Sequence, residues 1–228
     1  MRVALVCVGD ELLAGDTGNT NATWLGRQLC DRGVDVERVT VVPDRVEGIA
    51  RVVNEYRADY DAVVVTGGLG PTHDDLTMEG VAAAVGSEVA EDADALAWLE
   101  EEGGYTRDDL AAGTADIPAV AEMLPNPEGV APGCVVENIY VLPGVPAEMK
   151  AMFDLVAEDF AGQQRYVETV EIDEPESALL DRFADLRERF DVRVGSYPGE
   201  TVRVKIHGTD PEAVEAAAGW LRDRVDAA

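Results

Sequence analysis

The sequence predicts an α/β protein with a mostly parallel sheet sandwiched by helices, followed by a small α+β subdomain. Three short apolar runs alternate with segments of helical spacing over the first 85 residues. Strands and helices that alternate in this way form a parallel sheet covered on both faces. The pattern changes after Gly162, so we expect one domain over residues 1–162 and a second over residues 163–228.

The first three strands are expected at Val3–Val8, Val34–Val42 and Ala62–Thr66, and Pro43 ends the second. Val3–Val8 and Ala62–Thr66 are apolar runs rich in β-branched residues, which are typical of strands buried on both faces of a parallel sheet.

Helical spacing predicts the segments between and after these strands. Apolar residues recur on one face of Thr20–Arg32, of Val46–Arg57 and of a segment from about residue 77 to residue 85. Gly33 ends the first helix. The polar residues Asp10–Asn19, between the first strand and the first helix, are expected to form a loop.

The middle of the chain is less regular. Residues 88–116 are acidic and helical in tendency, so we expect helices beside the sheet and no strong strand. The short apolar runs Cys134–Val136 and Ile139–Leu142 predict a hairpin or a sheet edge, and Pro146–Phe160 predicts a helix.

The C-terminal part predicts a β-α-β-β-α order. Tyr166–Ile172 alternates between apolar and polar residues, and Glu176–Phe190 has helical spacing. Val192–Gly195 and Thr201–Ile206 are strand-like, and Pro211–Val225 carries a buried helical stripe. The sizes of these elements fit a small α+β subdomain.

The net charge is −28, from 46 acidic and 18 basic residues, of which only two are lysines. Such a surface repels nucleic acids and anionic membranes, so we expect neither as a partner. The acids are dispersed along the chain, which is typical of proteins that work in concentrated intracellular salt, where charge repulsion is screened. The alternative is an acidic face for a cationic partner.

The N-terminal apolar run meets Asp10 and Glu11 at once and lacks the features of a signal peptide. No segment approaches the ~20 apolar residues that span a bilayer. We therefore expect a cytoplasmic protein. Its three cysteines are too few and too far apart to predict a disulfide framework or a zinc site.

The strongest local signal is the loop from Thr66 to Thr77, which follows a buried strand and opens a helix. Gly67, Gly68 and Gly70 let backbone N–H groups approach phosphate oxygens, and the helix N-terminus adds its dipole. Ligands of parallel sheets bind at the carboxyl ends of the strands. The loop therefore predicts a phosphate site, which also includes Thr72. The alternative is an ordinary turn.

Two carboxylates, Asp74 and Asp75, precede the helix, and carboxylates beside phosphates typically hold Mg²⁺. The alternative is that an aspartate caps the helix. We expect the neighbouring His73 to be exposed or hydrogen-bonded, not a metal ligand.

The loop after the first strand can reach the same crevice. It supplies Asp10 and Glu11, and then Asn19 and Asn21. Asn19 or Thr20 could instead cap the first helix.

Two further turns complete the candidate site. Asp44 follows the second strand and is either a third carboxylate of the crevice or a turn residue. Pro143 and Gly144 follow the Ile139–Leu142 run, where a rigid backbone leaves room for a ligand or makes a strand-to-helix turn.

The motifs GDELL, NTN, PD, TGGLGPTHDDLT and LPGVPAEM, in this order, resemble the MoaB/Mog family. They look most like the N-terminal domain of competence/damage-inducible protein A (CinA) and its stand-alone archaeal relatives. The resemblance runs from Met1 to about Phe160. Gly195-Ser196-Tyr197-Pro198 more weakly resembles the small appendage that follows this domain in such proteins.

The resemblance implies a ligand site and a chemistry. Asp75 and Asp44 fall on positions that serve metal binding and catalysis in the molybdopterin enzymes. The glycine loop and the loop at Pro143 and Gly144 fall on the ligand-binding loops. Relatives include nucleotide pyrophosphatases that use a divalent metal, so Mg²⁺, Mn²⁺ or Co²⁺ is implied, as is a homo-oligomer, either a dimer or a trimer.

Three functions fit this resemblance. The first is metal-dependent hydrolysis of a nucleotide pyrophosphate such as ADP-ribose or FAD. The second is binding or adenylylation of molybdopterin, although Leu69 stands where the adenylyltransferases usually have threonine. The third is a nucleotide-binding module without turnover. No counterpart of the CinA amidase domain is present, so we expect amidase activity to be absent.

Overall fold

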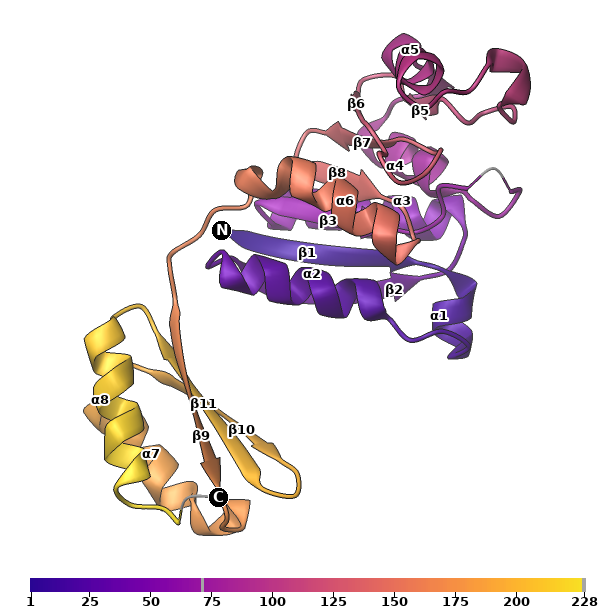
Figure 1. The fold of residues 1–228 in the computed structure, drawn as a ribbon. Helices are drawn as coiled ribbons and strands as arrows, with labels where there is room; N and C mark the ends of the chain where they lie inside the picture. The colour runs from indigo at the N-terminus through magenta and orange to yellow at the C-terminus, as the bar shows by residue number, and fades with distance from the viewer. Residues whose placement is uncertain (71, 227–228) are drawn as a thin grey trace. The chain divides into compact units, whose positions relative to one another are not determined.

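The computed structural model describes residues 1–70 and 72–226 (Figure 1), which form two compact units. The larger unit comprises residues 1–30 and 34–162. The smaller unit comprises the chain from Gln163 onward together with Asp31–Gly33. Each unit has a hydrophobic core of its own.

The larger unit is built on a six-stranded sheet in the order β2-β1-β3-β8-β7-β6. The strands β2, β1, β3 and β8 are parallel, while β7 and β6 are antiparallel to their neighbours. The mostly parallel sheet and the antiparallel β7–β8 pair are as predicted. The strands are β1 (Arg2–Val8), β2 (Asp35–Val42), β3 (Ala62–Thr66), β6 (Glu122–Leu124), β7 (Gly133–Val136) and β8 (Ile139–Leu142).

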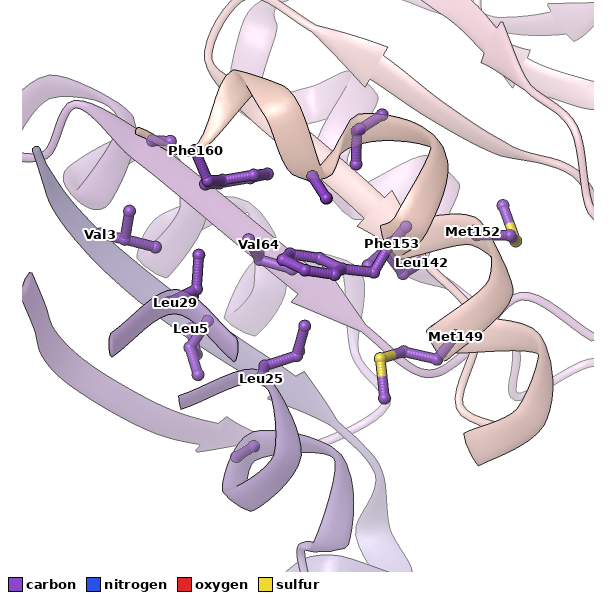
Figure 2. Packing of buried hydrophobic residues seen from close by; sticks show 14 of the residues in the cluster. Val3, Leu5, Leu25, Leu29, Val64, Leu142, Met149, Met152, Phe153 and Phe160 are labelled. Carbon is purple, nitrogen blue, oxygen red and sulfur yellow. The ribbon is translucent and has the colours of Figure 1, made fainter. Parts of the chain in front are cut away.

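Helices cover both faces of this sheet, because alternate residues of each buried strand point to opposite sides. Leu5 lies in the core cluster that includes α2 (Thr20–Asp31) and α6 (Pro146–Val156). Val6 lies in the cluster that includes α3 (Val46–Asp59) and α4 (Thr77–Val85). Figure 2 shows the first cluster, in which Phe153 packs beside Val64.

Aromatic side chains anchor this cluster. Phe153 and Phe160 are almost completely buried and stack with ring centroids 5.5 Å apart. Trp24 meets Phe153 edge-on at the same centroid distance. The packing holds α2 and α6 against the sheet and so fixes the loops that lead into both helices.

Two expectations about irregular segments are only partly right. Asp10–Asn19 contains a short helix, α1 (Asp10–Ala14), which ends at Gly15 in the left-handed conformation. The segment 88–116 contains α5 (Ala93–Glu101) and a 3-10 turn, η1 (Arg107–Asp109), but it also includes β4 (Val89–Glu91) and the start of β5 (Asp116–Pro118). These two strands pair with each other and are too short to show a periodic pattern.

The smaller unit has a three-stranded antiparallel sheet in the order β10-β11-β9. Two helices pack on one face, where Val204, Ile206 and Leu221 are fully buried. Its elements are β9 (Tyr166–Ile172), α7 (Leu180–Arg189), β10 (Arg193–Pro198), β11 (Val202–Gly208) and α8 (Pro211–Arg222). A 3-10 turn, η3 (Glu176–Ala178), precedes α7. In the larger unit another 3-10 turn, η2 (Ala157–Asp159), follows α6.

None of the helices in the described residues is long and apolar enough to cross a membrane. The three cysteines are free thiols; Cys7 and Cys134 are buried and Cys30 is exposed.

Candidate functional site

A cavity of about 250 Å³ lies where the parallel strands of the larger unit end. The turns that follow β1, β2, β3 and β8 all contribute to its wall, as expected for an open α/β sheet. Nine of the predicted site residues line it: Glu11, Asn19, Asn21, Asp44, Gly67, Gly68, Asp74, Asp75 and Gly144.

The glycine loop after β3 has a backbone that only glycine accommodates well. Gly67 has a φ of 101°, and a Cβ there would lie 2.2 Å from the carbonyl oxygen of Val8. Gly68 has a φ of 62°, and a Cβ there would lie 2.5 Å from Oγ1 of Thr77. The buried Thr77 holds the loop, because its Oγ1 donates to the Gly67 carbonyl at 2.8 Å and its N–H to the Gly68 carbonyl at 3.2 Å.

The carboxylate of Asp75 is fixed by the same loop. Its Oδ2 accepts hydrogen bonds from the N–H of Thr72 at 3.0 Å and from the Thr72 hydroxyl at 2.5 Å. A Cβ on Gly70 would lie 2.5 Å from this oxygen, so glycine leaves the space that the carboxylate needs. Oδ1 of Asp74 also lies 2.5 Å from the Thr72 hydroxyl, whose single proton the two carboxylates share, and this hydrogen bonding lowers the pKa of Asp74. Pro71 lies outside the described residues.

Another carboxylate of the cavity wall, Asp44, lies in the turn after β2. Its Oδ2 accepts a hydrogen bond from the backbone N–H of Asp10 at 2.7 Å. Partial burial raises the pKa of Asp44, and the nearby charges of Asp10, Glu11 and Asp74 raise it further against the lowering effect of that hydrogen bond. Asp44 is therefore a carboxylate whose charge the neighbouring acids disfavour.

Two asparagines at the start of α2 line the cavity. Oδ1 of Asn19 accepts from the N–H of Ala22 at 3.0 Å, so this residue caps α2 and also lines the cavity. Nδ2 of Asn21 donates to the Gly144 carbonyl at 2.7 Å. Asn21 lines the cavity, and its Oδ1 is buried without a hydrogen-bond partner among the described residues.

The remaining predicted residues do not line this cavity. Asp10 and Thr72 act through their hydrogen bonds to Asp44 and to the Asp74–Asp75 pair, and Gly70 lies in a neighbouring cavity. Pro143 precedes Gly144 without lining the cavity. The side chain of His73 is 98% exposed, as expected.

The sequence reasoning missed several residues of the site. Thr17 and Pro146 line the cavity, and Thr77 braces the glycine loop. Thr77 opens a helix, so its sequence position suggested only a helix start. Its burial depends on the close approach of the loop, which the sequence pattern does not reveal.

All ionisable side chains in the cavity wall are acidic. Glu11, Asp44, Asp74 and Asp75 line it, whereas no lysine, arginine or histidine does so within residues 1–70 and 72–226. The same residues contain no group of three or more metal-binding side chains already gathered around one point. An anionic ligand would therefore meet repulsion here unless a cation entered with it.

Comparison with known proteins places the chain in a family. Residues 4–163 match the family described as "Probable molybdopterin binding domain". The chain therefore belongs to this family.

Within the family the chain is close to CinA. It is 45% identical over 165 residues to a CinA-like protein of Frankia casuarinae, covering 67% of this chain and 38% of that protein. The crystal structure of the Thermoplasma acidophilum protein CinA, of unknown function, is 38% identical with a TM-score of 0.64, covering 70% of this chain and 97% of that one. A protein of Archaeoglobus fulgidus is 36% identical over 219 residues and matches 95% of both chains.

Proposed function

We propose that this protein hydrolyses a nucleotide pyrophosphate such as ADP-ribose or FAD with the help of a divalent cation. The observation that supports this most is the composition of the cavity wall, which combines a glycine loop with carboxylates and no cationic side chain among the described residues. Glycine-loop N–H groups suit phosphate oxygens, while the carboxylates suit a hard divalent cation.

The carboxylates that would hold Mg²⁺, Mn²⁺ or Co²⁺ are Asp75, Asp44 and Asp74. Their oxygen donors fit such ions. Burial and then the nearby acids raise the pKa of Asp44, and a bound cation would offset the repulsion among these acids. When bound, the cation would neutralise phosphate charge and lower the pKa of a water molecule that it holds.

The residues of the chain itself orient the reaction. Asp75 and Asp44 are the catalytic carboxylates, held by hydrogen bonds from Thr72 and Asp10. The N–H groups of the glycine loop stabilise the charge that develops on phosphoryl oxygens. Water forms a new bond to one phosphorus atom, the bond from this phosphorus to the bridging oxygen breaks, and the proton released by the water leaves to solvent. ADP-ribose would give AMP and ribose 5-phosphate.

Molybdopterin is the competing ligand, since the family description names it. Leu69 favours the pyrophosphatase, because the adenylyltransferases that the sequence resembles usually have threonine at this position. A binding module without turnover is the third candidate.

The test is a turnover screen of ADP-ribose, FAD and NAD with Mg²⁺, Mn²⁺ and Co²⁺ at high potassium, with molybdopterin binding measured in parallel. We expect metal-dependent AMP release, which Asp75→Ala should lower by more than the ~10–100-fold typical of losing an outer-shell partner of a metal. Circular dichroism should show an unchanged fold. Undiminished turnover in the variant, or molybdopterin binding far tighter than ADP-ribose binding, would reject the proposal.

A further inference from the structure

Two further cavities lie next to the 250 Å³ cavity of the candidate site, which we call the acid-lined cavity. Gly68 and Asp75 also line a second cavity of about 90 Å³. Leu69 and Gly70 line this second cavity and a third one of about 280 Å³, which we call the outer cavity. Neighbouring cavities share wall residues and all three border the glycine loop, so we call the three adjoining cavities together the trough.

The chemistry of the wall changes along this trough. The acid-lined cavity presents four carboxylates, whereas the outer cavity is faced mainly by the apolar side chains of Leu69, Tyr105, Leu110 and Val130. Asp109 and Thr114 add polar atoms to the outer cavity. A ligand that fills the trough therefore meets carboxylates at one end, where an anionic group needs a cation beside it, and a largely apolar wall at the other.

The loop that carries Tyr105 is held by local contacts. The N–H of Tyr105 donates to the Leu99 carbonyl at 3.1 Å, and a Cβ on Gly103 would lie 3.0 Å from the Tyr105 ring. Thr106 and Asp109 then form a capping box around η1, with hydrogen bonds of 3.0 and 2.6 Å to Oδ2 of Asp109.

A second anchor ties this loop to the rest of residues 89–124 of the larger unit, which we call the appendage from here on. The guanidinium of Arg107 lies 2.5 and 2.7 Å from the two carboxylate oxygens of Glu91 in β4. Strand β4 pairs with β5, and β5 contacts α4, the helix that follows the glycine loop. Figure 1 shows α5 and β5 near β6, the edge strand of the six-stranded sheet. These contacts hold in place the loop that carries Tyr105.

We propose that the outer cavity binds the purine base of a nucleotide whose phosphates lie in the acid-lined cavity. This inference rests on the proposed function and names the part of the substrate that ADP-ribose and FAD share, their adenosine diphosphate moiety. An aromatic ring among apolar side chains is the usual surface on which a base stacks. A volume of about 280 Å³ is below the ~300–1,000 Å³ of pockets that take whole drug-sized ligands, so it suits one ring system.

The test compares the binding of AMP with that of inorganic pyrophosphate, each titrated calorimetrically in the presence of Mn²⁺. Tyr105→Ala and Leu110→Ala should weaken AMP binding by roughly tenfold, as the loss of one stacking contact does. Both variants should leave pyrophosphate binding within about twofold, while Tyr105→Phe should keep the binding of both, since the ring remains.

The matched control is Val120→Ala. Val120 lies in the same appendage, is 65% exposed and lines none of the three cavities in the part of the chain that the structure describes. It should bind both probes like the wild type. Thermal unfolding of each variant shows whether the appendage remains folded.

Equal weakening of both probes, unchanged AMP binding in Tyr105→Ala and Leu110→Ala, or a wild type that does not bind AMP would each overturn the base site. The predicted binding pattern without AMP release from ADP-ribose would reject hydrolysis and leave the base site standing.

Discussion

The backbone N–H of Asp10 donates a hydrogen bond to Oδ2 of Asp44 at 2.7 Å, which joins the start of α1 to the turn after β2. Both residues follow neighbouring parallel strands, so the sheet places them side by side. The bond orients one oxygen of Asp44, while partial burial and the acids around it make the charged carboxylate unfavourable. The carboxylate of Asp44 is thus held in place, but the groups around it do not offset its negative charge. Such an arrangement is expected where a functional site lowers the stability of the fold.

This relationship predicts how stability depends on pH. Burial raises the pKa of Asp44 above its ordinary value of 3.8, so the neutral carboxyl favours folding. Its contribution is fully present below the ordinary pKa and is lost as the pH rises through the raised value. Asp44→Asn should therefore have a higher Tm than the wild type near about pH 7.

The difference in Tm should shrink as the pH falls through the raised pKa of Asp44 and should be smallest below the ordinary value of 3.8. Thermal unfolding in a chelator across this range is the measurement, and the asparagine retains an oxygen for the Asp10 bond. An asparagine variant less stable than the wild type at neutral pH would contradict the assigned sign. Metal-dependent turnover should fall in the same variant.

The glycine loop gives a second prediction, on backbone strain. Gly15→Ala places a side chain at a φ of 78° with no atom within 4 Å, so it should cost only the left-handed penalty of about 1–2 kcal/mol. Gly67→Ala adds a collision 2.2 Å from the Val8 carbonyl oxygen and should cost a further ~1–3 kcal/mol. Urea denaturation of both variants tests the difference, and equal losses would show that the close approach of Gly67 to Val8 is unimportant.

The cysteines give a third prediction, on thiol reactivity. Burial raises the pKa of Cys134 to about 12 and also raises that of Cys7, while Cys30 is exposed. Because the thiolate is the reactive form, iodoacetamide should label Cys30 in the native protein and the other two only after unfolding. Mass spectrometry of the labelled peptides decides, and rapid native labelling of Cys134 would be inconsistent with its burial.

Local signals in the sequence were enough to predict the parallel core. Val3–Val8 and Ala62–Thr66 are strands within a residue of the predicted bounds, because a doubly buried strand must be apolar throughout. Parallel strands bring their carboxyl ends to one edge, so the convergence of Asp44, Gly68, Asp75 and Gly144 on one cavity also followed from the strand order.

The appendage could not be predicted in this way. Strands β4 and β5 have three residues each and pair across an intervening helix, so neither shows a pattern of its own. The position of Tyr105 on a cavity depends on that pairing and on the capping box at Thr106. Thr77 was missed for a related reason, because its role depends on the backbone of a loop that precedes it.

The most direct test of a metal-bridged pyrophosphate site is the affinity of the protein for ADP-ribose with and without Mn²⁺. The affinity is measured at high potassium, in a time too short for ADP-ribose to be hydrolysed. An acid-lined wall should bind this anion at least roughly tenfold more tightly when Mn²⁺ is present, with the reciprocal gain in Mn²⁺ affinity, and Asp75→Asn should abolish the coupling. Equal affinity in Mn²⁺ and in chelator would show that no cation links the carboxylates to the phosphates, and the proposed chemistry would fail.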